Sequence, residues 1–79
     1  MKARIIVTLK TGVLDPQGKA IEAALKSFGI DGVEGVRQGK VFDVEVASPD
    51  AATAEAALKS ACEKLLANTV VENYAIEIA

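Results

Sequence analysis

Cys62 is the only thiol in the chain. A nucleophilic cysteine needs a base or a lowered pKa, and histidine, the usual base, is absent from the sequence. Cys62 also falls on an Ala-rich apolar stripe with helical spacing, where a cysteine acts as a small buried side chain. The stripe consists of Ala54, Leu58, Ala61, Cys62 and Leu65. We therefore expect Cys62 to be structural.

Asp43 and Glu45 are the paired carboxylates of a predicted strand face. Acid–base catalysis by two carboxylates requires that one be desolvated, so that their pKa values separate. Nothing around these residues indicates desolvation, and we expect them to be solvated or paired with cations. With no His and one Cys, the chain also lacks the usual metal ligands. We predict no catalytic residue, no metal site and no cofactor in this chain.

The segment Arg37–Lys40 places two cations on either side of a predicted hairpin turn. Such cations can bind an acidic patch or a phosphate on a partner, and an ordinary charged hairpin tip is an equally good interpretation. The segment Gly29–Gly32 has the spacing of an RNA-clamping loop, but Asp31 carries the wrong charge for that role. These glycines are more simply turn residues.

Hydrophobic periodicity predicts six elements. Alternating apolar residues indicate strands, whereas Asp15-Pro16 and Ser48–Asp50 are typical helix starts, with a capping side chain beside a proline. The predicted elements are strands at Lys2–Lys10, Val33–Arg37, Lys40–Ala47 and Val70–Ile78 and helices at Pro16–Phe28 and Ala51–Ala67.

This order predicts a ferredoxin-like βαββαβ domain of the α+β class, a single domain over residues 1–79. Such a two-layer α/β sandwich has a four-stranded antiparallel sheet with two helices on one face. The other face would be bare, with apolar residues between charges of both signs: Arg4, Ile6, Thr8, Val41, Asp43, Glu45, Val71, Asn73, Ala75 and Glu77. We expect a partner to cover this face, and a solvated face with Arg4 paired to Asp43 or Glu45 is the alternative.

Composition excludes several classes of function. The chain has 79 residues, a net charge of −2 and a pI near 5.0, which gives no basic footprint for nucleic acid or an anionic membrane. An RNA-recognition domain shares the element order, but acidic residues stand where its base-stacking aromatics belong. No apolar run is long enough to cross a membrane, and the N-terminal apolar stretch is too short for a signal peptide. We expect a cytoplasmic protein.

Three stretches carry a resemblance to a known family. They are VTLKTGVLDPQG (7–18), VEGVRQGK (33–40) and LLANTVVE (65–72). In order, length and spacing they resemble PurS, the small subunit of bacterial and archaeal phosphoribosylformylglycinamidine synthase. The stretch Gly12–Gly18 is the most specific part. Thr69 stands where many relatives would have Pro, and either residue ends a helix.

The resemblance implies a non-catalytic subunit of a complex in de novo purine biosynthesis. It implies a glutaminase subunit (PurQ) that releases ammonia, and a large synthetase subunit (PurL) that uses ATP and magnesium. The small subunit would be a homodimer or tetramer that bridges the two and assists ammonia transfer. We expect five residues at subunit contacts: Asp15, Gln17, Gly18, Arg37 and Lys40. Whether the last strand pairs within its own chain stays open.

An ACT-like regulatory domain is the alternative function, because it has the same element order. Such domains bind amino acids at a dimer interface near the first strand–helix loop. Thr11–Asp15 would be that loop here.

Overall fold

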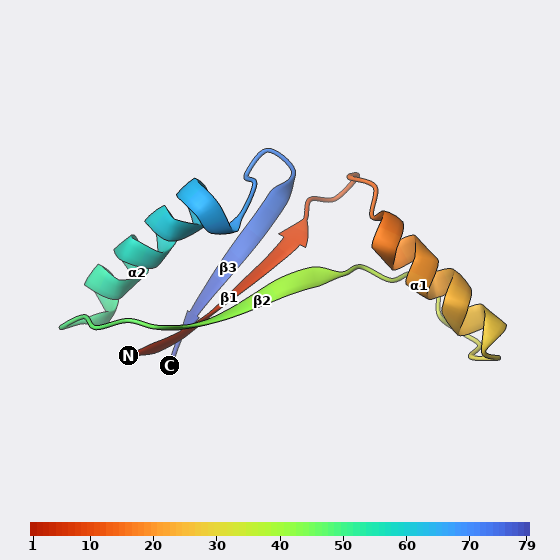
Figure 1. The fold of residues 1–79 in the computed structure, drawn as a ribbon, viewed down its shortest axis with the longest axis horizontal. Coiled ribbons are helices and arrows are strands. Elements are labelled where there is room, and N and C mark those ends of the chain that lie inside the picture. Colours follow the sequence, from red (N-terminus) through yellow and green to blue (C-terminus); the bar gives the residue numbers. More distant parts are fainter.

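The computed structural model describes residues 1–79 and contains three strands and two helices, the second extended by a π-helical turn (Figure 1). The elements in chain order are β1 (Lys2–Leu9), α1 (Pro16–Ser27), β2 (Gly39–Glu45), α2 (Ala51–Ala61), η1 (Cys62–Leu66) and β3 (Glu72–Ile78). The α+β class is confirmed. None of the helices is both long and apolar enough to cross a membrane.

The three strands form an antiparallel sheet in the order β2-β1-β3. In the central strand, Ile5 lies opposite Phe42 of β2 and Ile76 of β3. The predicted alternation is confirmed, since Ala3, Ile5 and Val7 are buried against α2 and η1 while the residues between them face outward. The last strand therefore pairs within its own chain.

The helix α2 begins where the sequence predicts and covers the buried face of β1 and β3. The Asp50 carboxylate caps it by accepting a hydrogen bond from the Thr53 N–H at 2.7 Å. Ala54, Leu58 and Cys62 are buried, as the apolar stripe predicts. Leu65 is wrongly predicted to join them and is 83% exposed. From Cys62 onward the backbone winds with a wider turn, closed by Ala67 N–H to Cys62 O at 2.9 Å, which shifts the helical register.

The prediction of four strands is wrong, because residues 33–37 form no strand and pair with no neighbour. No hairpin turn occurs at Gln38–Gly39 either, since the chain runs without reversal from this extended segment into β2. Polar groups of Arg37 and Gln38 are instead bound to the loop after β1 and to Asp15. The sheet consequently lacks its fourth strand.

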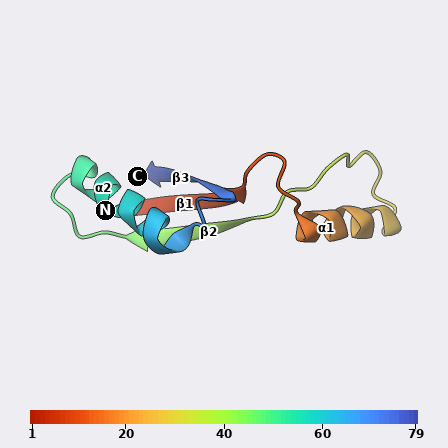
Figure 2. The same cartoon turned by 90° about the horizontal axis from the view of Figure 1, so that it is seen from above.

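The prediction that both helices cover one face of the sheet is also wrong. Residues 10–38, which we name the arm, project beyond the end of the sheet, with α1 far from α2 (Figures 1 and 2). The chain measures 50 × 25 × 15 Å and has a radius of gyration of 16.0 Å. A compact chain of this length would have a radius of about 12 Å. The extended shape leaves α1 with at most marginal contact to any strand or to α2.

Candidate functional site

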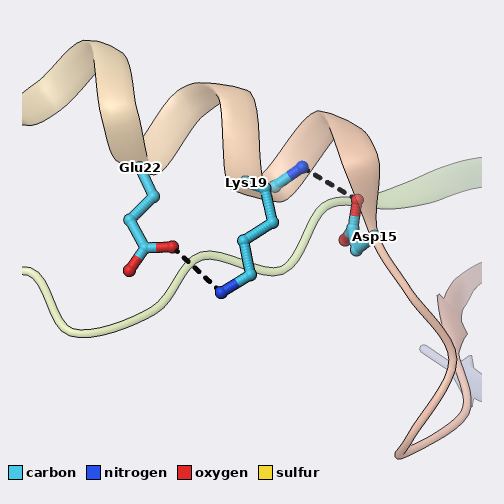
Figure 3. Close-up of polar contacts among 4 residues, drawn as sticks. Asp15, Lys19 and Glu22 are labelled. Atoms are coloured by element: carbon cyan, nitrogen blue, oxygen red, sulfur yellow. Dashed lines mark hydrogen bonds and ion pairs between the residues drawn. The ribbon is translucent and has the colours of Figure 1, made fainter.

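The arm is fixed to the sheet at a hinge built around Asp15. This residue caps α1: its Oδ1 accepts a hydrogen bond from the Gly18 N–H at 2.8 Å (Figure 3). Its Oδ2 accepts from the Gln38 N–H at 2.9 Å. The hydrogen bonds from the Gln38 and Gly18 backbone lower the pKa of the buried Asp15 carboxyl below its ordinary value of 3.8. One carboxylate thus joins the start of α1 to the start of β2.

Arg37 closes the other side of the hinge. Its Nη2 donates to the carbonyl oxygens of Leu9 at 3.0 Å and Lys10 at 3.1 Å, and its Nη1 donates to that of Val13 at 3.3 Å. The planar guanidinium suits such a cluster of acceptors, because its N–H groups point outward in a fixed fork. Arg37 thereby binds the loop after β1 to the segment before β2.

Gly18 lets the two halves of the hinge approach each other. A Cβ atom at this position would overlap the carbonyl oxygen of Val36 and lie 3.0 Å from the Asp15 carboxyl. The glycine in the first turn of α1, where glycine weakens a helix, is therefore required by packing. On the same helix, the exposed Lys19 and the half-buried Glu22 form an ion pair at 3.5 Å (Figure 3). We name Asp15, Gly18, Arg37 and Gln38 the latch.

All five sequence-predicted contact residues lie at this hinge. Gln17 and Lys40 border a shallow depression beside Asp15, and Lys40 Nζ lies 3.6 Å from Glu72 Oε2 on β3. Sequence reasoning missed Gln38 and Glu72. Gln38 contributes through its backbone N–H, which no side-chain pattern reveals, and Glu72 approaches Lys40 only through strand pairing.

The sheet face opposite α2 is bare, as predicted, and polar at one end. Arg4 Nε lies 2.9 Å from Asp43 Oδ1, and this hydrogen bond lowers the pKa of the Asp43 carboxyl. Both side chains are mostly exposed, so the pair is open to solvent. Further along the face, Ile6 lies opposite Val41 and Ala75, and Val41 is 59% exposed. The bare face therefore carries a small apolar patch beside an ion pair.

The remaining titratable side chains form no catalytic arrangement. Cys62 is buried, and burial raises the pKa of its thiol. Tyr74 donates its hydroxyl hydrogen to Glu63 at 3.3 Å, and burial raises its pKa as well. No group of three or more His, Cys, Asp or Glu side chains is placed to hold a metal ion. The features available for function are thus the hinge of the arm and the exposed surfaces, above all the bare sheet face.

Comparison with known proteins identifies the family. Residues 2–79 match the family model of PurS, phosphoribosylformylglycinamidine (FGAM) synthase. The chain belongs to the PurS family. Its function is that of a PurS subunit of FGAM synthase in purine biosynthesis, which favours the resemblance seen in the sequence over the ACT-like alternative.

Curated and solved relatives are similar over nearly the whole chain. The PurS subunit of Synechocystis is 51% identical over 75 residues, which cover 95% of this chain and 75% of that protein. The crystal structure of Bacillus subtilis PurS superposes with a TM-score of 0.86 at 43% identity, covering 96% of this chain and 94% of the other. A chain in the structure of PurLQS from Thermotoga maritima gives a TM-score of 0.89 at 37% identity, covering 96% and 93%.

Proposed function

We propose that this PurS subunit bridges a glutaminase subunit (PurQ) and a large synthetase subunit (PurL) and assists the transfer of ammonia between them. The observation that carries the proposal is the likeness, over almost the full chain, to a chain in PurLQS from Thermotoga maritima. The subunit itself performs no step of the reaction. It associates with further copies of itself, in a dimer or tetramer, and with the two larger chains.

The chemistry of ammonia explains why a subunit without catalytic residues is useful. Ammonia released into water at neutral pH becomes ammonium, which has no lone pair with which to attack an activated amide. An interface that excludes water keeps the nucleophile neutral and close to its target. A chain with no His and one buried Cys can help to form such a seal from its surfaces alone.

Two surfaces are available for these contacts. The bare face offers the apolar patch around Ile6 and Val41 beside the Arg4–Asp43 pair. At the hinge, Gln17 and Lys40 border the depression and do not belong to the latch. We propose that Asp15, Gln17, Gly18, Arg37 and Lys40 lie at subunit contacts. Within the chain, Asp15, Gly18 and Arg37 also hold the arm in position.

The proposal assigns ATP and magnesium to the synthetase subunit and no cofactor to this chain. It places the complex in the cytoplasm, as the sequence leads us to expect. The single buried cysteine suits that reducing compartment.

Reconstitution tests the proposal. The two larger subunits are assayed with and without this chain, once with glutamine and once with an ammonium salt as the nitrogen source. We expect the chain to raise glutamine-dependent turnover and to leave ammonia-dependent turnover nearly unchanged, because the ammonium salt bypasses transfer. Equal glutamine-dependent rates with and without the chain would overturn the bridging role. Glutaminase or synthetase activity of the isolated chain would overturn its non-catalytic assignment.

A further inference from the structure

The outer edge of β3 has no neighbour in the chain. β3 is the last strand of the sheet on the side away from β2, and no helix or strand runs along its outer edge (Figure 2). Its pairing with β1 continues without a bulge from Glu72 to Ile78. Sheets commonly protect such an edge with a bulge, a proline or a lysine, because unpaired backbone groups pair readily with another chain. The sequence of β3, ENYAIEI, contains neither proline nor lysine, so its edge is regular and open.

Alternate residues of β3 direct their backbone groups outward. Beside one end of the strand the Lys10 N–H donates to Val71 O at 2.9 Å, so the odd-numbered residues of β3 are those bonded to β1. The N–H and C=O groups of the even-numbered residues therefore point away from the sheet. The Glu72 N–H is bound to Asn68 O at 2.8 Å. Three residues keep both groups unpaired at the edge: Tyr74, Ile76 and Ile78.

The spacing of these groups determines what can bind them. They recur every second residue, about 6.8 Å apart along the strand, and another extended strand presents its own donors and acceptors at the same interval. The side chains of Tyr74, Ile76 and Ile78 belong to the core side of the sheet and are only partly buried. An added strand would cover these side chains while it pairs with their backbone. The edge therefore suits an extended segment of another chain.

The charges of β3 indicate the kind of segment. The strand carries two carboxylates, Glu72 and Glu77, and no cationic side chain. Lys40 Nζ lies 3.6 Å from Glu72 Oε2. Arg4 lies opposite Glu77, but its guanidinium is bound to Asp43 on β2 at 2.9 Å, and the exposed Glu77 forms no ion pair. A Lys or Arg at the facing position of an added strand would supply the missing cation.

A second copy of this chain is a poorer match for the edge. Its β3 would again bring two carboxylates and no cation, so the two joined strands would hold four carboxylates. Lys40 of each copy lies beside Glu72 and leaves Glu77 without a cation. Like charges on neighbouring strands destabilise their pairing. The edge thus favours a different chain, with a cationic side chain in its strand.

We propose that an extended segment of one of the larger subunits adds to the outer edge of β3 as a further strand, with a Lys or Arg facing Glu77. The inference rests on the proposed function, which supplies the larger chains, and deepens it by naming a surface of attachment and the chemistry of the segment. Backbone hydrogen bonds to Tyr74, Ile76 and Ile78 provide the affinity, and the ion pair with Glu77 fixes the register. The contact is separate from the hinge.

Amide hydrogen exchange resolved to single residues tests the added strand on the unmodified chain. Exchange is measured for the isolated chain and for the chain reconstituted with the two larger subunits. In the isolated chain we expect fast exchange at Tyr74, Ile76 and Ile78 and slow exchange at the odd-numbered residues between them, which are bonded to β1. In the complex the three outward amides should slow by about tenfold or more. Outward amides that stay fast in the complex, or that are already slow in the isolated chain, would overturn the proposal.

Reversal of the charge at Glu77 provides the second test. Glu77→Lys places a cation against the proposed cation, and we expect the Kd for the larger subunits to rise on the order of tenfold. Glu77→Gln, which removes the charge without reversing it, should give a smaller rise. Asp31→Lys makes the same change of charge in the arm, away from β3, and should leave the Kd unchanged. Circular dichroism and light scattering check that each variant keeps the fold and mass of the parent. An equal Kd for Glu77→Lys and Asp31→Lys would overturn the proposal.

These outcomes are separable from those of the reconstitution assay. Strand addition is measured as protection of three backbone amides, whereas bridging is measured as glutamine-dependent turnover. A chain whose outward amides become protected in the mixture but that does not raise turnover would overturn the bridging role only. A chain that raises turnover while these amides stay fast would overturn the strand addition only.

Discussion

The Asp15 carboxylate and the Gln38 backbone N–H meet at 2.9 Å across the hinge of the arm. The same carboxylate caps α1 through Gly18 at 2.8 Å. Because both oxygens are bound to backbone donors, this one side chain joins the first turn of α1 to the residue before β2. This arrangement makes the hinge accessible to mutation at one position.

Removal of the Asp15 carboxylate should loosen the hinge and lower the stability of the fold. In Asp15→Ala the Gly18 and Gln38 N–H groups lose their acceptor, and we expect the Tm to fall by roughly 4–8 °C, as for the loss of a helix cap in a small domain. Thermal unfolding followed by circular dichroism measures the change. The control is Asp31→Ala, because Asp31 is an exposed acidic residue of the arm whose side chain makes no hydrogen bond. An equal Tm for both variants would contradict the latch.

The latch should also make stability dependent on pH in the acid range. The pKa of Asp15 is lowered in the folded chain, so its contribution is complete above the unfolded value near 3.8 and is lost as pH falls through the lower folded value. Asp43 and Asp50, whose pKa values are also lowered, contribute in the same direction. We expect the Tm to be level above about pH 5 and to fall below about pH 4.

The variant Asp15→Asn shows how much of this fall in Tm at acid pH is due to Asp15. The amide cannot be protonated in this range, so the drop in Tm between pH 7 and pH 3 should be smaller in the variant than in the parent. Paired melts of both proteins at each pH provide the measurement. Identical drops would show that the acid sensitivity resides in other carboxylates, such as Asp50.

Gly18 and Gly35 form a matched pair for testing the close approach in the hinge. Ala normally stabilises a helix relative to Gly by about 1 kcal/mol, yet Gly18→Ala should lower the Tm because the new methyl group would overlap Val36 O. Gly35→Ala meets no atom within 4 Å and needs no positive φ, so it should be neutral or slightly stabilising. A higher Tm for Gly18→Ala would show that the hinge does not close in this way.

Replacing Arg37 with Lys should reduce the order of the loop after β1. A single ammonium group cannot reach the carbonyls of Leu9, Lys10 and Val13 with the geometry of a guanidinium fork. We expect faster amide hydrogen exchange in residues 10–15 of Arg37→Lys, and faster still in Arg37→Ala, with the exchange of β3 unchanged. Unchanged exchange in the loop would mean that the guanidinium contributes nothing to its order.

The elements that local sequence determines were predictable. The alternation in residues 3–7 gives the buried side of β1, and Asp15-Pro16 and Asp50 mark helix starts that the structure confirms. These signals work because a strand face, a cap and an apolar stripe each depend on residues a few positions apart. The exception, Leu65, follows a change of helical winding that no apolar spacing reveals.

The position of α1 was not predictable from the same signals. It depends on hydrogen bonds between Asp15 and Gln38, 23 residues apart, and between Arg37 and carbonyl groups that every residue possesses. The fourth strand fails for a related reason, since pairing requires a neighbouring strand edge, and the arm carries residues 33–37 away from the sheet. The five predicted contact residues do gather at the hinge, but their bonding within the chain appears only in three dimensions.

The last prediction concerns the bare face. It distinguishes the docking of a larger subunit from the association of this chain with copies of itself. Val41→Glu places a carboxylate in the exposed apolar patch beside Ile6. If a larger subunit covers this patch, the buried charge weakens docking, and glutamine-dependent turnover of the reconstituted complex should fall while the isolated chain keeps its mass and Tm. Ala56→Glu, on the exposed side of α2, is the control and should leave turnover unchanged. Equal turnover for the two variants would show that the larger subunits bind elsewhere, with Gln17 and Lys40 at the hinge as the next contacts to replace.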